Sequence, residues 1–143
     1  MDVARKLLIL ARETGLTLEM KDIEVESLLP KGSEKHNTVE DFLEYLSQFD
    51  EPMSTRLKSL QKVGKVLRYI GSIEGGKAKV SLQEVGPKHP FYSLTGSDNI
   101  IAFRTRRYDG QPLVIMGAGA GAVVTAAGVF GDILSCCRNK NNE

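Results

Sequence analysis

Hydrophobic residues in the first part of the chain follow a helical period and then a strand-like one. Residues 2–13 carry apolar side chains three and four positions apart, which predicts an amphipathic helix. Gly15 stands where a glycine commonly follows a helix. Residues 23–29 alternate apolar and polar side chains as far as Pro30, which predicts a short strand. The apolar face of the predicted helix comprises Val3, Ala4, Leu7, Leu8 and Ala11.

Two further helices are predicted in the next segment. Thr38 is a favourable N-cap residue, and Asp41 follows three positions later in an arrangement like a capping box. Pro52 is expected to interrupt the chain, so a separate helix is expected over residues 53–63, with Gly64 as its stop. The apolar stripe of the first of these helices comprises Val39, Phe42, Leu43, Leu46 and Phe49.

The second half of the chain changes to the period of β-strands. Residues 66–73 form one predicted strand, Gly75 and Gly76 a two-residue hairpin turn, and residues 77–83 the return strand. In the return strand a polar side chain occupies every second position, which is typical of an antiparallel sheet with one solvated face.

A turn-rich connection over residues 86–99 leads to the last predicted elements. Residues 99–108 form a strand, residues 113–116 a short buried strand, and residues 122–134 an alanine-rich helix. The order is helix, strand, two helices, antiparallel strands, helix. It favours an α+β fold, with an antiparallel or mixed sheet and helices on one face, over a doubly wound parallel sheet.

One uncharged segment, residues 110–131, is long enough to cross a bilayer. It contains Pro112 and six glycines, and each glycine weakens a helix by about 1 kcal/mol relative to alanine. A buried strand followed by a glycine turn and a helix fits this segment better, so no membrane partner is expected.

Composition narrows the function only slightly. The 143 residues are 26% charged and 41% hydrophobic with a net charge of +1, which is typical of a globular protein. Residues 1–53 carry 6 basic and 12 acidic groups, whereas residues 54–110 carry 11 basic and 4 acidic groups. The basic stretch 104–107 falls on a predicted strand; the solvent side of a sheet is the favoured interpretation, and a nucleic-acid face is the alternative.

Asp2 and Lys6 are the first candidates for chemistry. They are four residues apart, so their side chains share one helix face. Such a pair is commonly a surface ion pair worth about 0.3–0.5 kcal/mol. In the functional alternative both point into a cleft, where Asp2 accepts hydrogen bonds from a polar substrate and Lys6 moves a proton.

The glycine-rich stretch 117–121 lies between a predicted strand and a predicted helix. Glycines allow a ligand to approach the backbone, and helix N-terminal amides attract phosphate. The stretch lacks the third glycine of a dinucleotide fingerprint, because residue 122 is alanine. Tight helix–strand packing is the competing explanation.

The remaining reactive residue types form no recognisable cluster. His36 and His89 are single loop histidines without ligand-like partners at short spacing, so no metal site is expected. Cys136 and Cys137 are adjacent in the chain and cannot connect distant segments by a disulfide.

At residues 2–6 the chain resembles the end of the homoserine dehydrogenase signature, in which an aspartate precedes a lysine by four residues. The sequence is most similar to those of the eukaryotic monofunctional enzymes and of the dehydrogenase half of plant aspartokinase–homoserine dehydrogenases. Further similar segments follow in order up to about Leu134: residues 7–13, 25–30, 66–71, 89–91, 94–101, 112–115, 117–121 and 124–129.

The resemblance implies NAD(P)H-dependent interconversion of L-aspartate 4-semialdehyde and L-homoserine, a step toward threonine, methionine and isoleucine. It implies that Lys6 passes a proton to the carbonyl oxygen, that Asp2 binds substrate, and that Gly121 touches the nucleotide, NADP or NAD. It also implies a homodimer that forms through the sheet, and it gives no role to nucleic acid.

The resemblance further implies a division of the chain. Residues 1–116 are expected to be the substrate-binding and dimerisation domain of a Rossmann-type oxidoreductase. Residues 117–135 are expected to return to the nucleotide-binding domain, and residues 136–143 to form a polar tail. The family's Rossmann half has no counterpart in these residues, so the isolated chain is expected to be inactive. The alternative is a non-catalytic module that pairs with full-length subunits. Cytoplasm and plastid both stay open.

Overall fold

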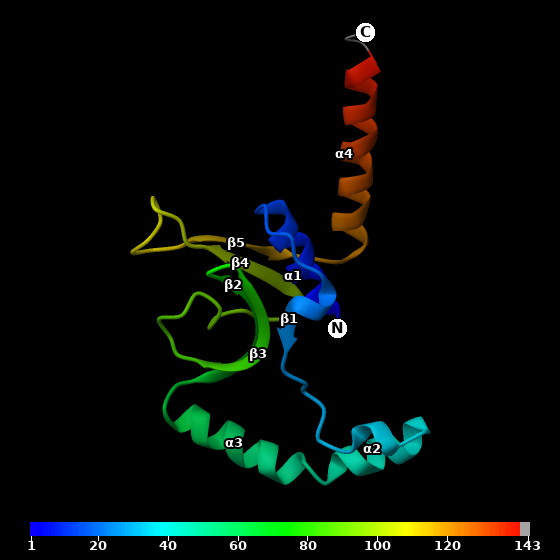
Figure 1. Cartoon of the computed structure of the whole chain (residues 1–143), viewed down its shortest axis with the longest axis vertical. Helices are drawn as coiled ribbons and strands as arrows, with labels where there is room; N and C mark the ends of the chain where they lie inside the picture. Colours follow the sequence, from blue (N-terminus) through cyan, green and yellow to red (C-terminus); the bar gives the residue numbers. More distant parts are fainter. Residues whose placement is uncertain (141–143) are drawn as a thin grey trace. The chain divides into compact units, whose positions relative to one another are not determined.

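A computed structural model describes residues 1–140, which fall into two compact units (Figure 1). The first unit comprises Met1–Tyr92, and the second begins at Ser93. Each unit is described by itself. Together they contain four α-helices and two small sheets, so the predicted α+β class with an antiparallel or mixed sheet is confirmed.

Helix α1, Asp2–Glu13, opens the first unit with the predicted bounds. Its apolar positions recur at helical spacing, and Ala4, Leu7 and Ala11 are buried. The helix ends at Glu13 with Thr14 as its C-cap, after which Gly15 adopts a φ of 87° that favours glycine. The amide of Leu16 then donates to the carbonyl of Ala11 at 3.1 Å, which closes the last turn.

The sheet of the first unit is mixed, with strand order β1-β3-β2. Strands β2, Val66–Glu74, and β3, Lys77–Val85, are antiparallel, and strand β1, Ile23–Val25, lies parallel to β3. Gly75 and Gly76, with φ of 55° and 77°, connect the hairpin as predicted.

Strand β1 is shorter than the predicted strand over residues 23–29. The 3-10 helix η1, Met20–Asp22, precedes it. The amide of Glu26 still donates to the Val80 carbonyl at 2.8 Å, but the amide of Leu29 donates to the Ser27 hydroxyl at 3.1 Å. This local hydrogen bond turns the chain away from the sheet, because serine offers the backbone an alternative partner.

The core lies between α1 and one face of this sheet. Side chains of alternate strand residues point to the same face, and the register places Ala78 opposite Ile73 and Val80 opposite Gly71. The core cluster of buried residues comprises Ala4, Leu7, Ile23, Ala78 and Val80, with Tyr69 and Ile73 packed against it. Helix α1 is thereby fixed by apolar burial on its inner face.

Helices α2, Val39–Ser47, and α3, Asp50–Lys62, connect β1 to β2, after the 3-10 helix η2, Ser33–Lys35. The Thr38 hydroxyl caps α2 by accepting from the Asp41 amide at 3.1 Å. The expected break at Pro52 is wrong, because α3 begins two residues earlier. Proline is tolerated there, since the amides of a first helical turn have no partner within the helix.

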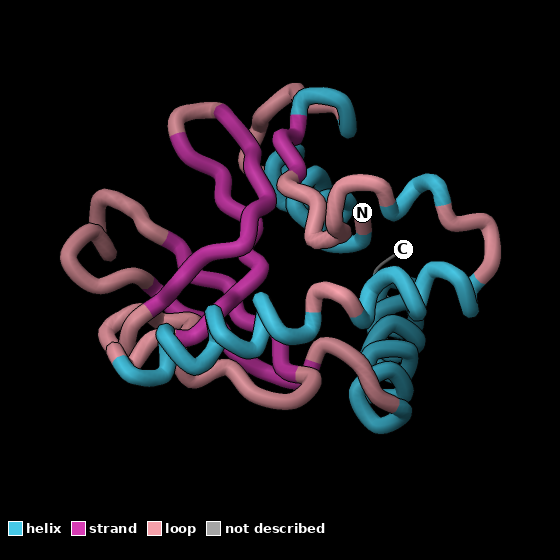
Figure 2. Tube along the Cα trace, turned by 90° about the horizontal axis from the view of Figure 1, so that it is seen from below, coloured by secondary structure: helices cyan, strands magenta, loops and turns pink. Residues whose placement is uncertain are grey.

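The second unit contains an antiparallel pair, β4, Asp98–Phe103, and β5, Leu113–Ala118, followed by helix α4, Ala122–Lys140. Figure 2 shows the strands in magenta and the helices in cyan. Among the described residues, no helix is long and apolar enough to span a membrane.

Three expectations for the second unit are wrong in detail. Strand β4 ends at Phe103, so the basic stretch 104–107 lies in the bends that follow and not on a strand. Every residue of β5 is exposed, although its apolar run predicted burial, because β4 covers its hydrogen-bonding edge and not its faces. Helix α4 continues past Leu134 through the exposed Cys136 and Cys137.

Candidate functional site

Asp2 and Lys6 lie together on the first turns of α1. Lys6 Nζ is 3.0 Å from Asp2 Oδ2, and the side chains are 63% and 74% exposed, respectively. The spacing of four residues brings them onto one helix face as predicted. In the described chain they form a surface ion pair that stands open to solvent.

Hydrogen bonds at both ends of α1 hold the backbone that carries this pair. The first turn is closed by the Arg5 amide, which donates to the Met1 carbonyl at 3.1 Å. At the other end of the helix, Arg12 donates to the Leu18 carbonyl at 3.1 Å and to the Glu19 carboxylate at 2.8 Å. Both ends of α1 are therefore tied down while the outward face carries the two charged side chains.

Gly121, the third candidate residue, is the N-cap of α4. Its carbonyl accepts from the Thr125 amide at 3.0 Å, and its φ is 126°, a conformation that side chains rarely adopt. A Cβ built at Gly121 would meet nothing within 4 Å, so the backbone there is open to an approaching group.

The other glycines of this turn have different reasons to be glycine. Gly117 lies in β5 opposite Asn99 of β4, and a Cβ at Gly117 would meet no atom within 4 Å. A Cβ at Gly119 would instead overlap the side-chain amide of Asn99. Close packing therefore explains Gly119, and backbone conformation explains Gly121.

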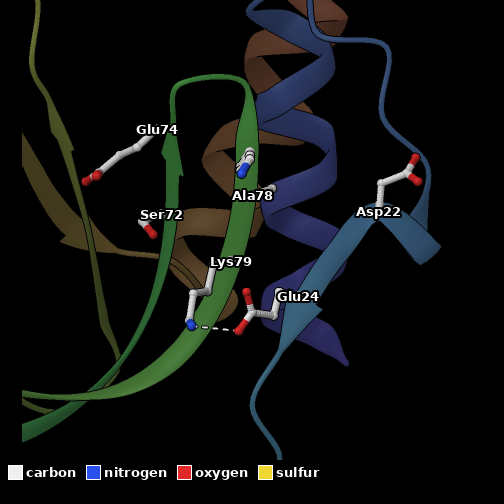
Figure 3. Close-up of a pocket in the computed structure, with 7 residues that line it drawn as sticks. Asp22, Glu24, Ser72, Glu74, Ala78 and Lys79 are labelled. Carbon is white, nitrogen blue, oxygen red and sulfur yellow. Dashed lines mark hydrogen bonds and ion pairs between the residues drawn. The ribbon is translucent and has the colours of Figure 1, made fainter.

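A pocket of about 450 Å³ on the first unit, lined mainly by charged residues, was not foreseen from the sequence. It opens on the sheet face opposite α1, where Lys79 Nζ of β3 lies 2.6 Å from Glu24 Oε1 of β1 (Figure 3). Hydrogen bonding to Glu24 and its negative charge raise the pKa of Lys79. The sequence signal that could have indicated this pocket is the occurrence of polar residues two positions apart on adjacent strands. The lining residues are Asp22, Glu24, Ser72, Glu74, Lys77, Ala78 and Lys79.

The two histidines have partners that spacing did not predict. His36 Nδ1 is 2.9 Å from the Asp41 carboxylate, and its ring stacks on Tyr45 at 4.4 Å between centroids. His89 Nδ1 accepts from the Phe91 amide at 3.1 Å. No group of three or more His, Cys, Asp or Glu side chains suited to a metal ion occurs within residues 1–140.

Comparison with known proteins first gives the class, which is that of the oxidoreductases. More narrowly, the family model described as homoserine dehydrogenase matches residues 1–134, and the chain belongs to this family. Asp2, Lys6 and Gly121 all lie within the matched residues.

The relatives are similar over nearly the whole chain. A bifunctional aspartokinase/homoserine dehydrogenase of Haemophilus influenzae is 50% identical over 133 residues, which is 93% of this chain and 16% of that protein. The homoserine dehydrogenase of Saccharomyces cerevisiae is 44% identical over 137 residues, 94% of this chain and 38% of that protein. The chain thus spans well under half the length of these relatives.

Solved structures show the same fold. A Candida auris protein described as of unknown function superposes with a TM-score of 0.81 and 42% identity, over 94% of this chain and 38% of that one. A chain from Archaeoglobus fulgidus assigned as a homoserine dehydrogenase gives a TM-score of 0.64 at 24% identity, over 94% of this chain and 35% of that one.

Proposed function

We propose that this chain supplies the substrate-binding and proton-transferring part of a homoserine dehydrogenase. The reaction is the NAD(P)H-dependent interconversion of L-aspartate 4-semialdehyde and L-homoserine. The observation that carries the proposal is the exposed Asp2–Lys6 pair, 3.0 Å apart on a helix whose inner face is buried in the core. An exposed acid–base pair on a rigid element is suited to meeting a polar substrate.

The chemistry assigned to these residues is simple. When bound, the reduced nicotinamide supplies a hydride to the carbonyl carbon of the semialdehyde. Lys6 Nζ gives a proton to the carbonyl oxygen as negative charge develops there, and the product is the hydroxyl of homoserine. Asp2 accepts hydrogen bonds from polar groups of the substrate, and its negative charge keeps the Lys6 ammonium close to the reacting oxygen.

The glycine turn of the second unit is assigned to the nucleotide, NADP or NAD. Gly121 has open space beside it and stands at the N-terminus of α4, whose amides favour a phosphate group. We assign the main nucleotide-binding domain, of Rossmann type, to sequence outside these 143 residues. The division at residues 116 and 135 belongs to the same proposal, with residues 1–116 for substrate and dimerisation and residues 117–135 for the return to the nucleotide.

The partner assigned to the chain is a second subunit, paired through the sheet. Strand β2 is an edge of the sheet β1-β3-β2 and is nine residues long, so its outer edge can accept another strand. A regulatory module that pairs with full-length subunits would use the same edge. A measurement of catalytic activity is therefore needed to distinguish the catalytic function from the non-catalytic one.

A chimeric enzyme tests the catalytic assignment. Residues 1–134 replace the matching segment of the yeast homoserine dehydrogenase, and oxidation of homoserine is followed by the absorbance of the reduced nucleotide. Lys6→Ala should lower kcat by about 100-fold or more, as expected for loss of a positioned proton donor. Arg5→Ala, an exposed neighbour on the same helix turn, is the matched control and should keep the parental kcat.

The isolated 143-residue chain should show no turnover, because hydride donor and proton donor must be held together. Equal activity of the Lys6→Ala and parental chimeras would remove the proposed role of Lys6. A chimera that folds and dimerises but has no activity would favour the non-catalytic module.

A further inference from the structure

Helix α1 approaches strand β2 unusually closely at one glycine. A Cβ built at Gly71 would lie 3.2 Å and 3.4 Å from the two Cδ atoms of Leu7. Carbon atoms in favourable contact are about 3.5–4.0 Å apart. Glycine inside a strand commonly marks a place where another element comes near, and the φ of Gly71 does not itself require glycine. The missing side chain therefore makes room for Leu7.

Leu7 has little freedom to give way. Its side chain is only 6% exposed and is packed in the core cluster with Ala4, Ile23, Ala78 and Val80. The other buried positions on the inner face of α1 are alanines, Ala4 and Ala11, which let the helix lie close to the sheet. Core side chains at native packing density tolerate added volume poorly, so extra bulk at residue 71 is transmitted to the helix.

The outward face of the same helical turns carries Asp2 and Lys6. Lys6 adjoins Leu7 in the chain, and Asp2 lies two residues before Ala4, so a displacement of the inner face moves the ion pair with it. We propose that Gly71 is a positioning residue: its missing side chain sets the distance of α1 from β2 and thereby the place of Lys6 Nζ. This inference rests on the proposed function of Lys6.

The expected size of the effect follows from the contact distances. An alanine at residue 71 requires a shift of a few tenths of an ångström, and a valine requires more. Because a misplacement of about 1 Å can lower a rate by about 100-fold, Gly71→Ala should lower kcat about threefold to tenfold, and Gly71→Val about 100-fold. Valine is favoured over glycine in strands, so weakened strand formation cannot explain a loss.

The test uses the yeast chimera with Gly71→Ala and Gly71→Val, measuring kcat, KM for homoserine and nucleotide, and Tm for each. The matched control is Ile70→Val, which alters a buried neighbour on the opposite face of the same strand. The control should have a lower Tm and the parental kcat. The Gly71 variants should have a lower kcat even at assay temperatures well below their Tm, with the KM for nucleotide unchanged.

A compensating pair provides the second measurement. Leu7→Val removes the two Cδ atoms that the new Cβ would meet, so Leu7→Val combined with Gly71→Ala should recover kcat relative to Gly71→Ala alone. If Gly71→Val does not fold, Gly71→Ala and this pair decide the question.

Parental kcat in folded Gly71→Ala and Gly71→Val, or no recovery in the pair, would overturn the positioning role. Activity that survives Lys6→Ala would instead refute the proposed function, so the two failures are distinguishable.

Discussion

Gly119→Ala tests the packing explanation for the glycine turn. The new Cβ would overlap the side-chain amide of Asn99, whose Cγ would lie only 2.5 Å away. Asn99 is exposed and the overlapping atoms belong to its side chain, so that side chain must turn away from β5, at a cost of about 0.5–1.5 kcal/mol where it leaves its preferred rotamer. Hydrogen exchange of the β4 and β5 amides measures this cost, because it reports the free energy of local opening.

Two further variants make the Gly119 experiment decisive. Gly117→Ala is the matched control, because a Cβ there meets no atom within 4 Å. Asn99→Ala removes the atoms that the new Cβ would overlap, so Asn99→Ala with Gly119→Ala should be more stable than the sum of the single changes predicts. Equal exchange rates for Gly119→Ala and Gly117→Ala would refute the reasoning.

Two other predictions concern the first unit. The raised pKa of Lys79 comes from its hydrogen bond to Glu24 and from the charge of Glu24, so Glu24→Gln should move it back toward the ordinary lysine value in an NMR titration of the side chain. A raised lysine pKa contributes stability that is fully present below the ordinary lysine pKa and is lost as the pH rises through the folded-state value. The parent should therefore be more stable than Glu24→Gln at neutral pH, and this difference should disappear at alkaline pH; an unchanged Lys79 titration would contradict this assignment. The proposed pairing through the β2 edge predicts a dimer at micromolar concentration in sedimentation; a monomeric parent chain would count against it. The hairpin register directs the Ile73 amide away from β3, so Ile73→Pro should shift the dimer toward monomer if a partner strand bonds there.

Local sequence patterns determined much of the first unit. Helix α1 has the predicted bounds because its apolar face and the glycine after it are close in sequence. The β2–β3 hairpin was predictable because paired glycines favour one type of turn. The i, i+4 spacing likewise placed Asp2 beside Lys6, since helix geometry alone brings such side chains together.

Local patterns failed in three places, each for a different physical reason. The predicted strand over residues 23–29 is cut short where the backbone finds a closer partner in Ser27. The apolar run of β5 suggested burial, but burial depends on which elements cover a strand, and β5 is exposed along its whole length. Pro52 suggested a break, but its position in the first turn of α3 makes it harmless.

By itself, the sequence determined the class of fold, the family and the Asp2–Lys6 pair. The helical period, the residue types that favour turns and the family motifs all depend on residues that are close together in the chain. Only the tertiary structure decided why Gly71 and Gly119 are glycines. It alone also showed that Glu24 meets Lys79 from another strand. Each of these contacts joins residues at least 20 positions apart. The space available to a side chain and the pairing of charges there depend on the register of the strands and on the position of a helix against the sheet. Packing of distant segments sets those distances, and no local period encodes them.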